Sequence, residues 1–193
     1  MTAGIELARD GGPDAVVLRE ATRRVGVSPN AAYRHFADRD ALLAAVSDAA
    51  LALLATCIDE IVERIPEGDP DVVARAQLRA VGTEYVSFAL DNPGLFHAAF
   101  FVASDLESSS APSKSGRSGR SPLALLTAAL DLLVSSGAMP SERRPQAEFL
   151  AWSSVHGFAL LLIDGPLRAL PRDQADVVTQ RLIDMVEAGF TCP

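Results

Sequence analysis

The chain has 193 residues, of which 49% are hydrophobic and 22% are charged, and its formal net charge is −8. It is long enough for one or two packed domains and too apolar to be a disordered chain. Only 6% of the residues are aromatic, and runs of Val, Ile and Thr with period-two alternation are missing. We therefore expect an all-α fold and exclude a β-sandwich or β-barrel.

The sequence offers no export, membrane or metal signal. No stretch approaches ~18 consecutive apolar residues, and Glu6 and Asp10 lie where a signal peptide would need a basic start and an apolar run. Cys57 and Cys192 lack CxxC spacing, which is typical of reduced thiols. His97 has no second ligand at metal spacing. We expect a cytoplasmic protein without a metal, a cofactor or a membrane partner.

The acidic net charge is unevenly distributed. Residues 1–45 contain six arginines and six acidic residues, so the remaining 148 residues carry the whole −8. Sixteen of the seventeen basic residues are arginines, whose planar fork suits phosphate and guanine. The acidity therefore does not exclude nucleic-acid binding by the N-terminal part.

Breakers and caps predict a succession of helices. Gly11-Gly12-Pro13 ends a short first helix, Gly26 ends a second, and Ser28-Pro29 begins a third that extends to about Phe36. Asp38 caps a long helix, 39–65. Further helices are expected at 71–91, 93–102, 122–136, 145–163 and 172–188. The Ser-rich segment 104–121 is expected to be a mobile loop, because it has too few apolar residues to offset its ordering entropy.

The second and third helices have the size and glycine turn of a helix-turn-helix. In the third helix, Ala32 and Phe36 are expected to face inward with Val25 and Val27. The exposed positions carry residue types that bind phosphates or base edges: Pro29, Asn30, Tyr33, Arg34 and His35. The spacing alone is also compatible with an αα-hairpin that has a solvated polar face.

Several ordered motifs resemble the tetracycline-repressor (TetR) family of bacterial transcription regulators. Over about 26 residues these are Leu18-Arg19-Glu20, Gly26-Val27-Ser28, Ala32-Tyr33-Arg34-His35-Phe36 and Asp38-Arg39-Asp40-Ala41-Leu42-Leu43. Further along, the segment 85–96, Trp152-Ser-Ser-Val-His-Gly157 and Leu160-Leu-Leu-Ile-Asp-Gly165 are similar to the C-terminal domain of a TetR subgroup with a Trp-x-x-x-His-Gly motif. The resemblance covers nearly the whole chain apart from 104–121.

The resemblance implies a homodimeric regulator with a DNA-binding domain at 1–46 and a domain for ligand binding and dimerisation at 47–193. By position, Arg19, Pro29, Asn30 and Ala31 are similar to residues that face bases. Tyr33, His35 and Arg39 match phosphate contacts, and Arg34 lies at a position that could contact either. Repression by operator binding is the expected activity, with release by a small lipophilic effector. The last two long helices are expected to form the dimer interface.

Three features depart from the family pattern. Val17 stands where a Ser or Thr usually caps the first motif helix, so one cap worth about 1 kcal/mol is absent. Thr22 replaces a small alanine, and its hydroxyl must bond a carbonyl one turn back or crowd the helix crossing. The family normally has a basic arm before the first helix, so either this helix is short or the true N-terminus lies upstream.

The resemblance places the effector among aromatic residues of the C-terminal domain. The candidates are Tyr85, Phe88, Phe96, Phe100, Trp152 and His156. Trp152 and His156 share a helix face, where they are either a core aromatic touching a satisfied histidine or a pocket wall with one polar handle. Ser153 or Ser154 could form a hydrolase triad with His156 and Asp164 only on a nucleophile elbow of the type Gly-x-Ser-x-Gly, which the sequence lacks. We therefore expect no enzyme. The competing function is a helical ligand-binding or scaffold module that does not read DNA.

Overall fold

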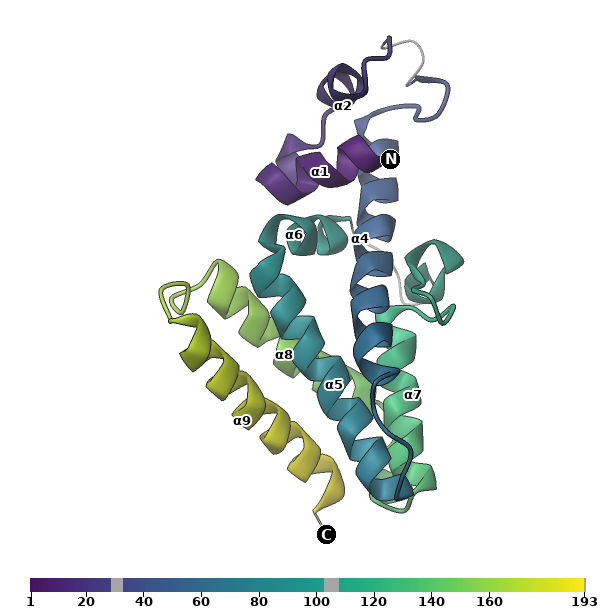
Figure 1. Cartoon of the computed structure of the whole chain (residues 1–193), viewed down its shortest axis with the longest axis vertical. Coiled ribbons are helices and arrows are strands. Elements are labelled where there is room, and N and C mark those ends of the chain that lie inside the picture. The colour runs from purple at the N-terminus through teal and green to yellow at the C-terminus, as the bar shows by residue number, and fades with distance from the viewer. Residues whose placement is uncertain (29–32, 103–107, 193) are drawn as a thin grey trace.

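The computed structural model describes residues 1–28, 33–102 and 108–192, and all regular structure in those ranges is helical. The predicted all-α class is therefore confirmed. An N-terminal lobe, formed by α1 (Thr2–Gly11), η1 (Pro13–Ala15), α2 (Leu18–Val25) and the start of α4 (Arg39–Val62), lies at one end of an elongated molecule. The α4 helix runs from this lobe along the body (Figure 1).

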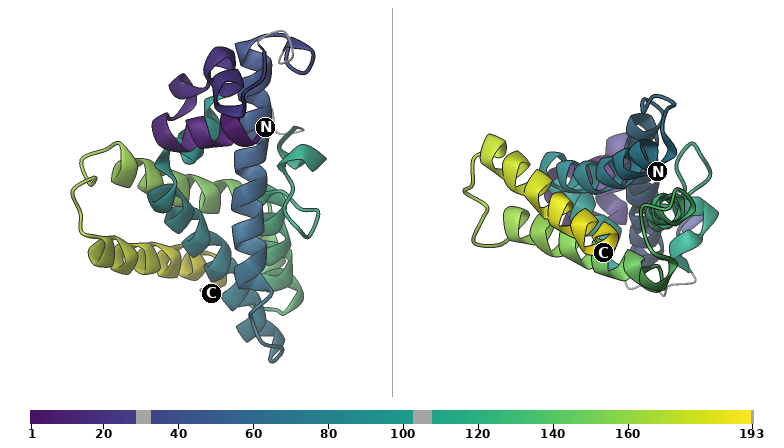
Figure 2. Two further views of the ribbon diagram at one scale, coloured as in Figure 1. Left: turned by 45° about the horizontal axis from the view of Figure 1, so that its top comes forward. Right: turned by 90° about the horizontal axis from the view of Figure 1, so that it is seen from below.

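The body is a bundle of helices around α5. It contains α5 (Pro70–Asp91), α6 (Pro93–Phe101), α7 (Pro122–Ser135), α8 (Ala147–Ile163) and α9 (Arg172–Thr191), with short 3-10 helices η2 (Ser108–Ser110), η3 (Pro112–Lys114) and η4 (Ser141–Arg143). The α5 helix contacts α4, α6, α7, α8 and α9. The α8 and α9 helices lie together on the side away from α4 (Figure 2).

Local capping chemistry sets these helix ends, and the cap at Asp38 and the stop at Gly26 are the predicted ones. The Asp38 carboxylate accepts a hydrogen bond from the Ala41 N–H at 2.8 Å, and Asp69 does the same for the Asp71 N–H at 2.9 Å. Gly26 ends α2 in the left-handed conformation, with φ 69°, which glycine adopts without a steric penalty. The α4 helix ends three residues earlier than expected, at Val62.

Val17 and Thr22, which depart from the family pattern, form the contacts that their chemistry requires. Val17 precedes α2 without a side-chain cap. The buried Thr22 hydroxyl donates to the Arg19 carbonyl at 2.8 Å, one turn back.

The expected inward packing of Val25 and Val27 is wrong. Val25 and Val27 are 55% and 46% exposed, although Val25 lies two turns after the buried Leu18 and therefore on the same face of α2. Burial of this face ends at Thr22. Phe36 is partly buried against the core, as expected. The predicted start of the third helix, at Pro29, Asn30, Ala31 and Ala32, lies outside the described residues.

The segment between α6 and α7 is better packed than its composition suggests. Its expected lack of burial is wrong for 108–121, where Lys114 and Ser121 are buried. The Ser118 N–H donates to the buried Asp59 carboxylate of α4 at 2.9 Å. A Cβ on Gly116 would lie 2.7 Å from the Thr56 nitrogen, so a glycine allows this chain to contact the α4 backbone closely. These contacts anchor the segment without a large apolar surface.

The α4 helix passes the length and hydropathy test for a membrane span, although 44% of its most apolar window is buried inside the protein. Val46, Ala50, Leu54 and Ile58 are fully buried, and the helix packs against α1, α5, α6 and α7. A core helix of a helical protein has the same features.

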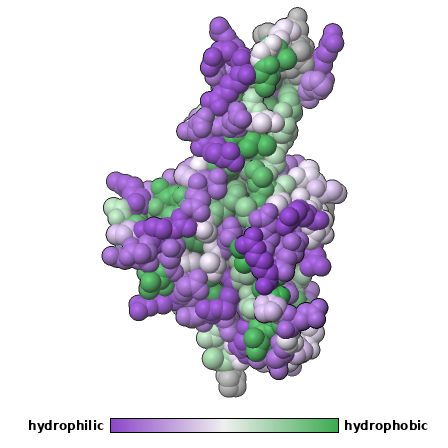
Figure 3. All heavy atoms as spheres, in the orientation of Figure 1, coloured by the Kyte–Doolittle hydropathy of each residue, from purple (hydrophilic) through white to green (hydrophobic). Residues whose placement is uncertain are grey.

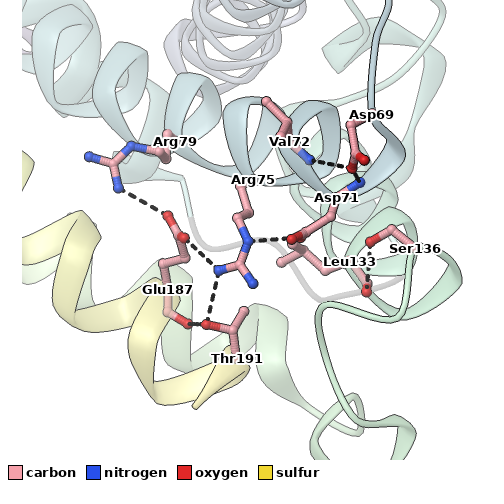
Figure 4. Close-up of polar contacts among 9 residues, drawn as sticks. All are labelled: Asp69, Asp71, Val72, Arg75, Arg79, Leu133, Ser136, Glu187 and Thr191. Carbon is pink, nitrogen blue, oxygen red and sulfur yellow. Dashed lines mark hydrogen bonds and ion pairs between the residues drawn. The ribbon is translucent and has the colours of Figure 1, made fainter.

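A charged cluster joins α9 to α5 (Figure 4). The Glu187 carboxylate of α9 accepts from Arg75 at 2.8 Å and from Arg79 at 3.0 Å. At the other end of α9, Arg172 pairs with Asp91 of α5. The inner side of α9 is thereby fixed along α5.

Candidate functional site

The N-terminal lobe exposes several side chains that can bind a polyanion. Arg19 is exposed on α2, and Tyr33, Arg34 and His35 are exposed between α2 and α4. In the space-filling view, hydrophilic residues cover both sides of this lobe, with a smaller hydrophobic area between them (Figure 3). Arginine, tyrosine and histidine side chains donate hydrogen bonds to phosphate oxygens.

Ion pairs occupy other arginines of the lobe. Glu20 accepts from Arg23 at 2.6 Å, and Asp10 accepts from Arg24 at 2.9 Å. The hydrogen bonds from Arg23 lower the pKa of Glu20, which stays ionised. Arg19 and Arg34 form no ion pair with any residue in the described ranges. A lobe of zero net charge can therefore expose unpaired cations at Arg19 and Arg34.

Arg39 has a structural task that the sequence did not predict. Its Nε donates to the Val16 carbonyl at 3.0 Å, and Nη2 donates to the Pro13 carbonyl at 2.8 Å. The side chain thus ties η1 to the first turn of α4. Because a guanidinium has five N–H donors, these bonds leave Nη1 available for a phosphate.

A cavity of about 290 Å³ lies inside the body. Side chains from α4 to α9 line it, and none of the lining residues within the described ranges is charged. Among the predicted ligand residues, Tyr85, Phe100 and Trp152 line this cavity. The sequence reasoning missed much of the aliphatic wall, namely Leu78, Val81, Val155, Ile183 and Val186. Their helical spacing predicts a buried face but does not distinguish a cavity wall from a filled core.

Three of the predicted residues form a hydrogen-bonded chain, of which Tyr85 and Trp152 line the cavity. Trp152 Nε1 donates to Tyr85 Oη at 3.0 Å, and Tyr85 Oη lies 2.8 Å from His156 Nδ1. Burial raises the pKa of the Tyr85 hydroxyl and lowers the pKa of His156, so both side chains are neutral near pH 7. The chain therefore supplies hydrogen-bonding capacity without charge.

The other predicted ligand residues lie elsewhere. Phe96 and His156 line a second cavity of about 660 Å³ between α6, α8 and the Gly11–Asp14 segment of the N-terminal lobe. Phe100 lines both cavities, with its ring centroid 4.8 Å from that of His156. These rings form a partition between the two spaces. Phe88 is buried and lines neither of them.

The N-terminal lobe is packed tightly on α6. A Cβ on Gly94 would lie 2.2 Å from the Ala8 carbonyl oxygen, so α6 begins in direct backbone contact with the end of α1. The buried Ser47 hydroxyl of α4 donates to the Ala99 carbonyl of α6 at 2.9 Å. A shift of α6 beside the cavity would therefore reach both α1 and α4.

The described residues offer no candidate metal centre. Within them, no three His, Cys, Asp or Glu side chains are grouped so that they could hold an ion. His97 Nε2 instead lies 2.7 Å from the exposed Asp164 carboxylate.

Family comparisons match the two parts of the chain separately. Residues 78–186 match a family described as "Tetracyclin repressor-like, C-terminal domain", and residues 1–46 match "Bacterial regulatory proteins, tetR family". Among the curated proteins, none matches the sequence significantly.

Solved structures share the architecture over almost the whole chain. A protein of unknown function from Rhodococcus sp. RHA1 is 25% identical, with a TM-score of 0.69, covering 98% of this chain and 92% of its own. A TetR variant from Acinetobacter baumannii AYE in complex with minocycline is 21% identical, with a TM-score of 0.65 and coverages of 97% and 92%. A tetR-family regulatory protein from Rhodococcus RHA1 is 18% identical, with a TM-score of 0.61 and coverages of 100% and 95%.

Proposed function

The chain belongs to the TetR family of transcriptional regulators, and we propose that it is a cytoplasmic repressor released from a palindromic operator by a small lipophilic effector. Residues 1–46 would bind DNA, and residues 47–193 would bind the effector and form a homodimer. The observation that carries this proposal is the cavity, whose described lining residues carry no charge and which is bounded by the α6 helix that contacts the N-terminal lobe.

The cavity favours an uncharged, mostly apolar effector. A charged ligand would lose its hydration without meeting an opposite charge among the described lining residues, which is costly in an apolar site. At ~30 Å³ per water molecule, the cavity volume corresponds to about ten waters. A compact molecule with one ring system fits this space, and Tyr85 Oη is its natural polar anchor.

The outer faces of α8 and α9 support a homodimer. Leu150 and Leu161 are exposed on α8, and Val178 and Met185 are exposed on α9. A Cβ on Gly157 or Gly189 would meet no atom within 4 Å, so small residues interrupt these faces. Two copies related by a two-fold axis could pack these stripes together as a four-helix interface.

The DNA proposal is tested by comparing Arg19→Ala with Arg23→Ala on the same helix. The operator is first selected from genomic fragments that the purified protein retains. Arg19→Ala should weaken binding and relax specificity at particular base pairs by about 1 to 3 kcal/mol each. Arg23 is the matched control, because its side chain is paired with Glu20 and its loss removes no unpaired cation.

The salt dependence of operator binding distinguishes the two candidate functions. A repressor that contacts phosphates should lose affinity steeply as salt rises, and Tyr33→Ala or Arg34→Ala should weaken binding to all sequences. Arg39→Ala should also lower stability, because it removes the bonds to Val16 and Pro13. A protein that retains no DNA fragment at low salt would instead be the ligand-binding module without DNA readout.

A further inference from the structure

The hydrogen bonds of Tyr85 have a defined direction. The Trp152 indole N–H can only donate, so Tyr85 Oη must accept at their 3.0 Å contact. The 2.8 Å contact with His156 Nδ1 then has two arrangements. Either the Tyr85 O–H donates to an unprotonated Nδ1, or a protonated Nδ1 donates to Tyr85 Oη.

The requirement that the Tyr85 O–H have an acceptor selects the first arrangement. In the second, the Tyr85 hydrogen would point away from both partners and would have no acceptor among the described residues. A buried donor without an acceptor is costly, whereas a hydroxyl oxygen with one unused lone pair is tolerated. The chain therefore runs from Trp152 to Tyr85 to His156, and the neutral imidazole carries its hydrogen on Nε2.

We propose that the Trp152–Tyr85–His156 chain is a reversible relay that lets the cavity bind effectors carrying a hydrogen-bond acceptor, such as a ketone. The acceptor takes the Tyr85 hydrogen, and His156 responds by placing its own hydrogen on Nδ1. One proton leaves Nε2 and one arrives at Nδ1 by exchange with water, so the ring stays neutral. This inference rests on the proposed function, because it names the class of molecule that the effector cavity recognises.

The relay connects the cavity to the N-terminal lobe. His156 does not line the effector cavity but lines the second one, which the Gly11–Asp14 segment also bounds. Its Nε2 makes no hydrogen bond to a residue in the described ranges. Reversal changes this nitrogen from a donor into an acceptor. A polar group on the effector would thus alter the chemistry of a space that it never enters.

Two probes of the same shape test the relay on the intact protein. Acetophenone carries a carbonyl acceptor, and ethylbenzene is its apolar counterpart. Nitrogen-15 NMR of the histidine side chains reports which ring nitrogen is protonated. The chain has only three histidines, so His35→Gln and His97→Gln variants assign the His156 signal. We expect the Nε2–H form in the free protein, unchanged by ethylbenzene and converted to Nδ1–H by acetophenone.

A variant gives an independent measurement of the same bond. Tyr85→Phe should bind ethylbenzene with retained affinity but lose its preference for acetophenone by roughly two- to twelve-fold, the range of one net hydrogen bond. Thr127→Val is the matched control, because it removes a hydroxyl that does not line the effector cavity. It should leave the preference unchanged.

The outcomes separate the relay from the proposed function. Binding of both probes with no change at His156 and equal affinities would overturn the relay while leaving the lipophilic-effector proposal intact. An Nδ1–H form in the free protein would also overturn it. If neither probe shifts the Trp152 fluorescence or the melting temperature, the premise of an open apolar cavity fails and the relay fails with it.

Discussion

Tyr85 lines a cavity whose described lining residues carry no charge, and its two partners determine how its hydroxyl can form hydrogen bonds. Trp152 and His156 are both on α8, one turn apart, whereas Tyr85 comes from α5. The spacing of Trp152 and His156 predicts a shared helix face from sequence. The 2.8 Å contact with Tyr85 joins residues 71 positions apart, which no local pattern encodes.

Helix caps, in contrast, are predictable from sequence because they join neighbouring residues. The Asp38, Asp69 and Gly26 caps each depend on atoms within four residues, so sequence chemistry determines them. The contacts of Arg39 could not be predicted in this way. The resemblance identified its charge as a phosphate contact, but its bonds to Pro13 and Val16 depend on how η1 meets α4.

Burial of His156 predicts a pH dependence of stability. Burial lowers the pKa of the folded-state imidazole, whereas in the unfolded chain it takes up a proton near pH ~6.5. Below that pH the unfolded state binds more protons, so the free energy of unfolding falls as the pH falls. This contribution is fully present above the unfolded-state pKa and is lost as the pH drops toward the lower folded-state value.

The His156→Gln variant measures this contribution. Its unfolding free energy should change less than that of the parent between about pH 7.5 and pH 5.5 in urea titrations. His97→Gln is the control, since that imidazole lies on the surface beside Asp164. An unchanged slope in His156→Gln would show that His156 does not contribute to the pH dependence.

At the scale of elements, α6 lies between the proposed effector cavity and the N-terminal lobe. Its Phe100 lines both cavities, while Gly94 lies against the end of α1. The boundaries of α6 were predicted within one residue, because Pro93 marks the start and the apolar run ends near Val102. Its contact with α1 was not predicted, since it depends on the tertiary packing of two distant segments.

The segment 108–121 shows a second limit of the sequence reasoning. The composition predicted a loop without burial, because the segment has few apolar residues that could anchor it. The observed anchors are polar and backbone contacts with α4, made by Lys114, Gly116 and Ser118. Whether the segment moves remains a prediction.

Gly94→Ala should disturb the contact between α6 and α1. The new Cβ would lie 2.2 Å from the Ala8 carbonyl oxygen, and the obstacle is backbone, so the two helices must separate. We expect a loss of roughly 1 to 3 kcal/mol in unfolding free energy, as for other overpacked sites. Operator affinity should also fall, because the lobe is displaced relative to α4.

The control for this prediction is Gly68→Ala. A Cβ at Gly68 would meet no atom within 4 Å, so both stability and operator affinity should stay near those of the parent. Denaturation and DNA titration of the two variants provide the comparison. Equal behaviour of Gly94→Ala and Gly68→Ala would mean that the contact with α1 has no energetic role.

At the scale of the whole molecule, oligomeric state should depend on the outer faces of α8 and α9. Leu150 is 63% exposed and Met185 is 62% exposed, so Leu150→Glu or Met185→Glu should not disturb the fold of one copy. Each substitution alone places one carboxylate per subunit in the interface. A carboxylate buried there without a partner opposes association. We expect monomers with lost operator affinity.

Sedimentation at micromolar concentration measures this effect. Leu132→Glu on α7 is the control, since Leu132 is also exposed but lies on another helix. The half-buried Leu182 is a poorer test, because it packs against the core and a charge there would also lower stability. A parent protein that is monomeric at this concentration would contradict the dimer proposal.

Effector and operator should compete without sharing a site. A dimer that reads adjacent major grooves needs its two recognition elements roughly 34 Å apart, one turn of duplex. An effector in the cavity contacts Phe100 of α6, which in turn meets α1 and α4, so it can favour a different spacing of the two lobes. The loss of operator affinity equals the effector's preference for that state, ordinarily about 1 to 3 kcal/mol, or 5- to 150-fold.

The measurement is a thermal-shift screen of lipophilic molecules, followed by operator titrations with each stabilising compound. Trp152→Ala should bind the hits differently from the parent, since Trp152 lines the cavity. Hits that stabilise the parent yet leave operator affinity unchanged would remove the coupling, and hits that stabilise both proteins equally would remove the cavity as their site.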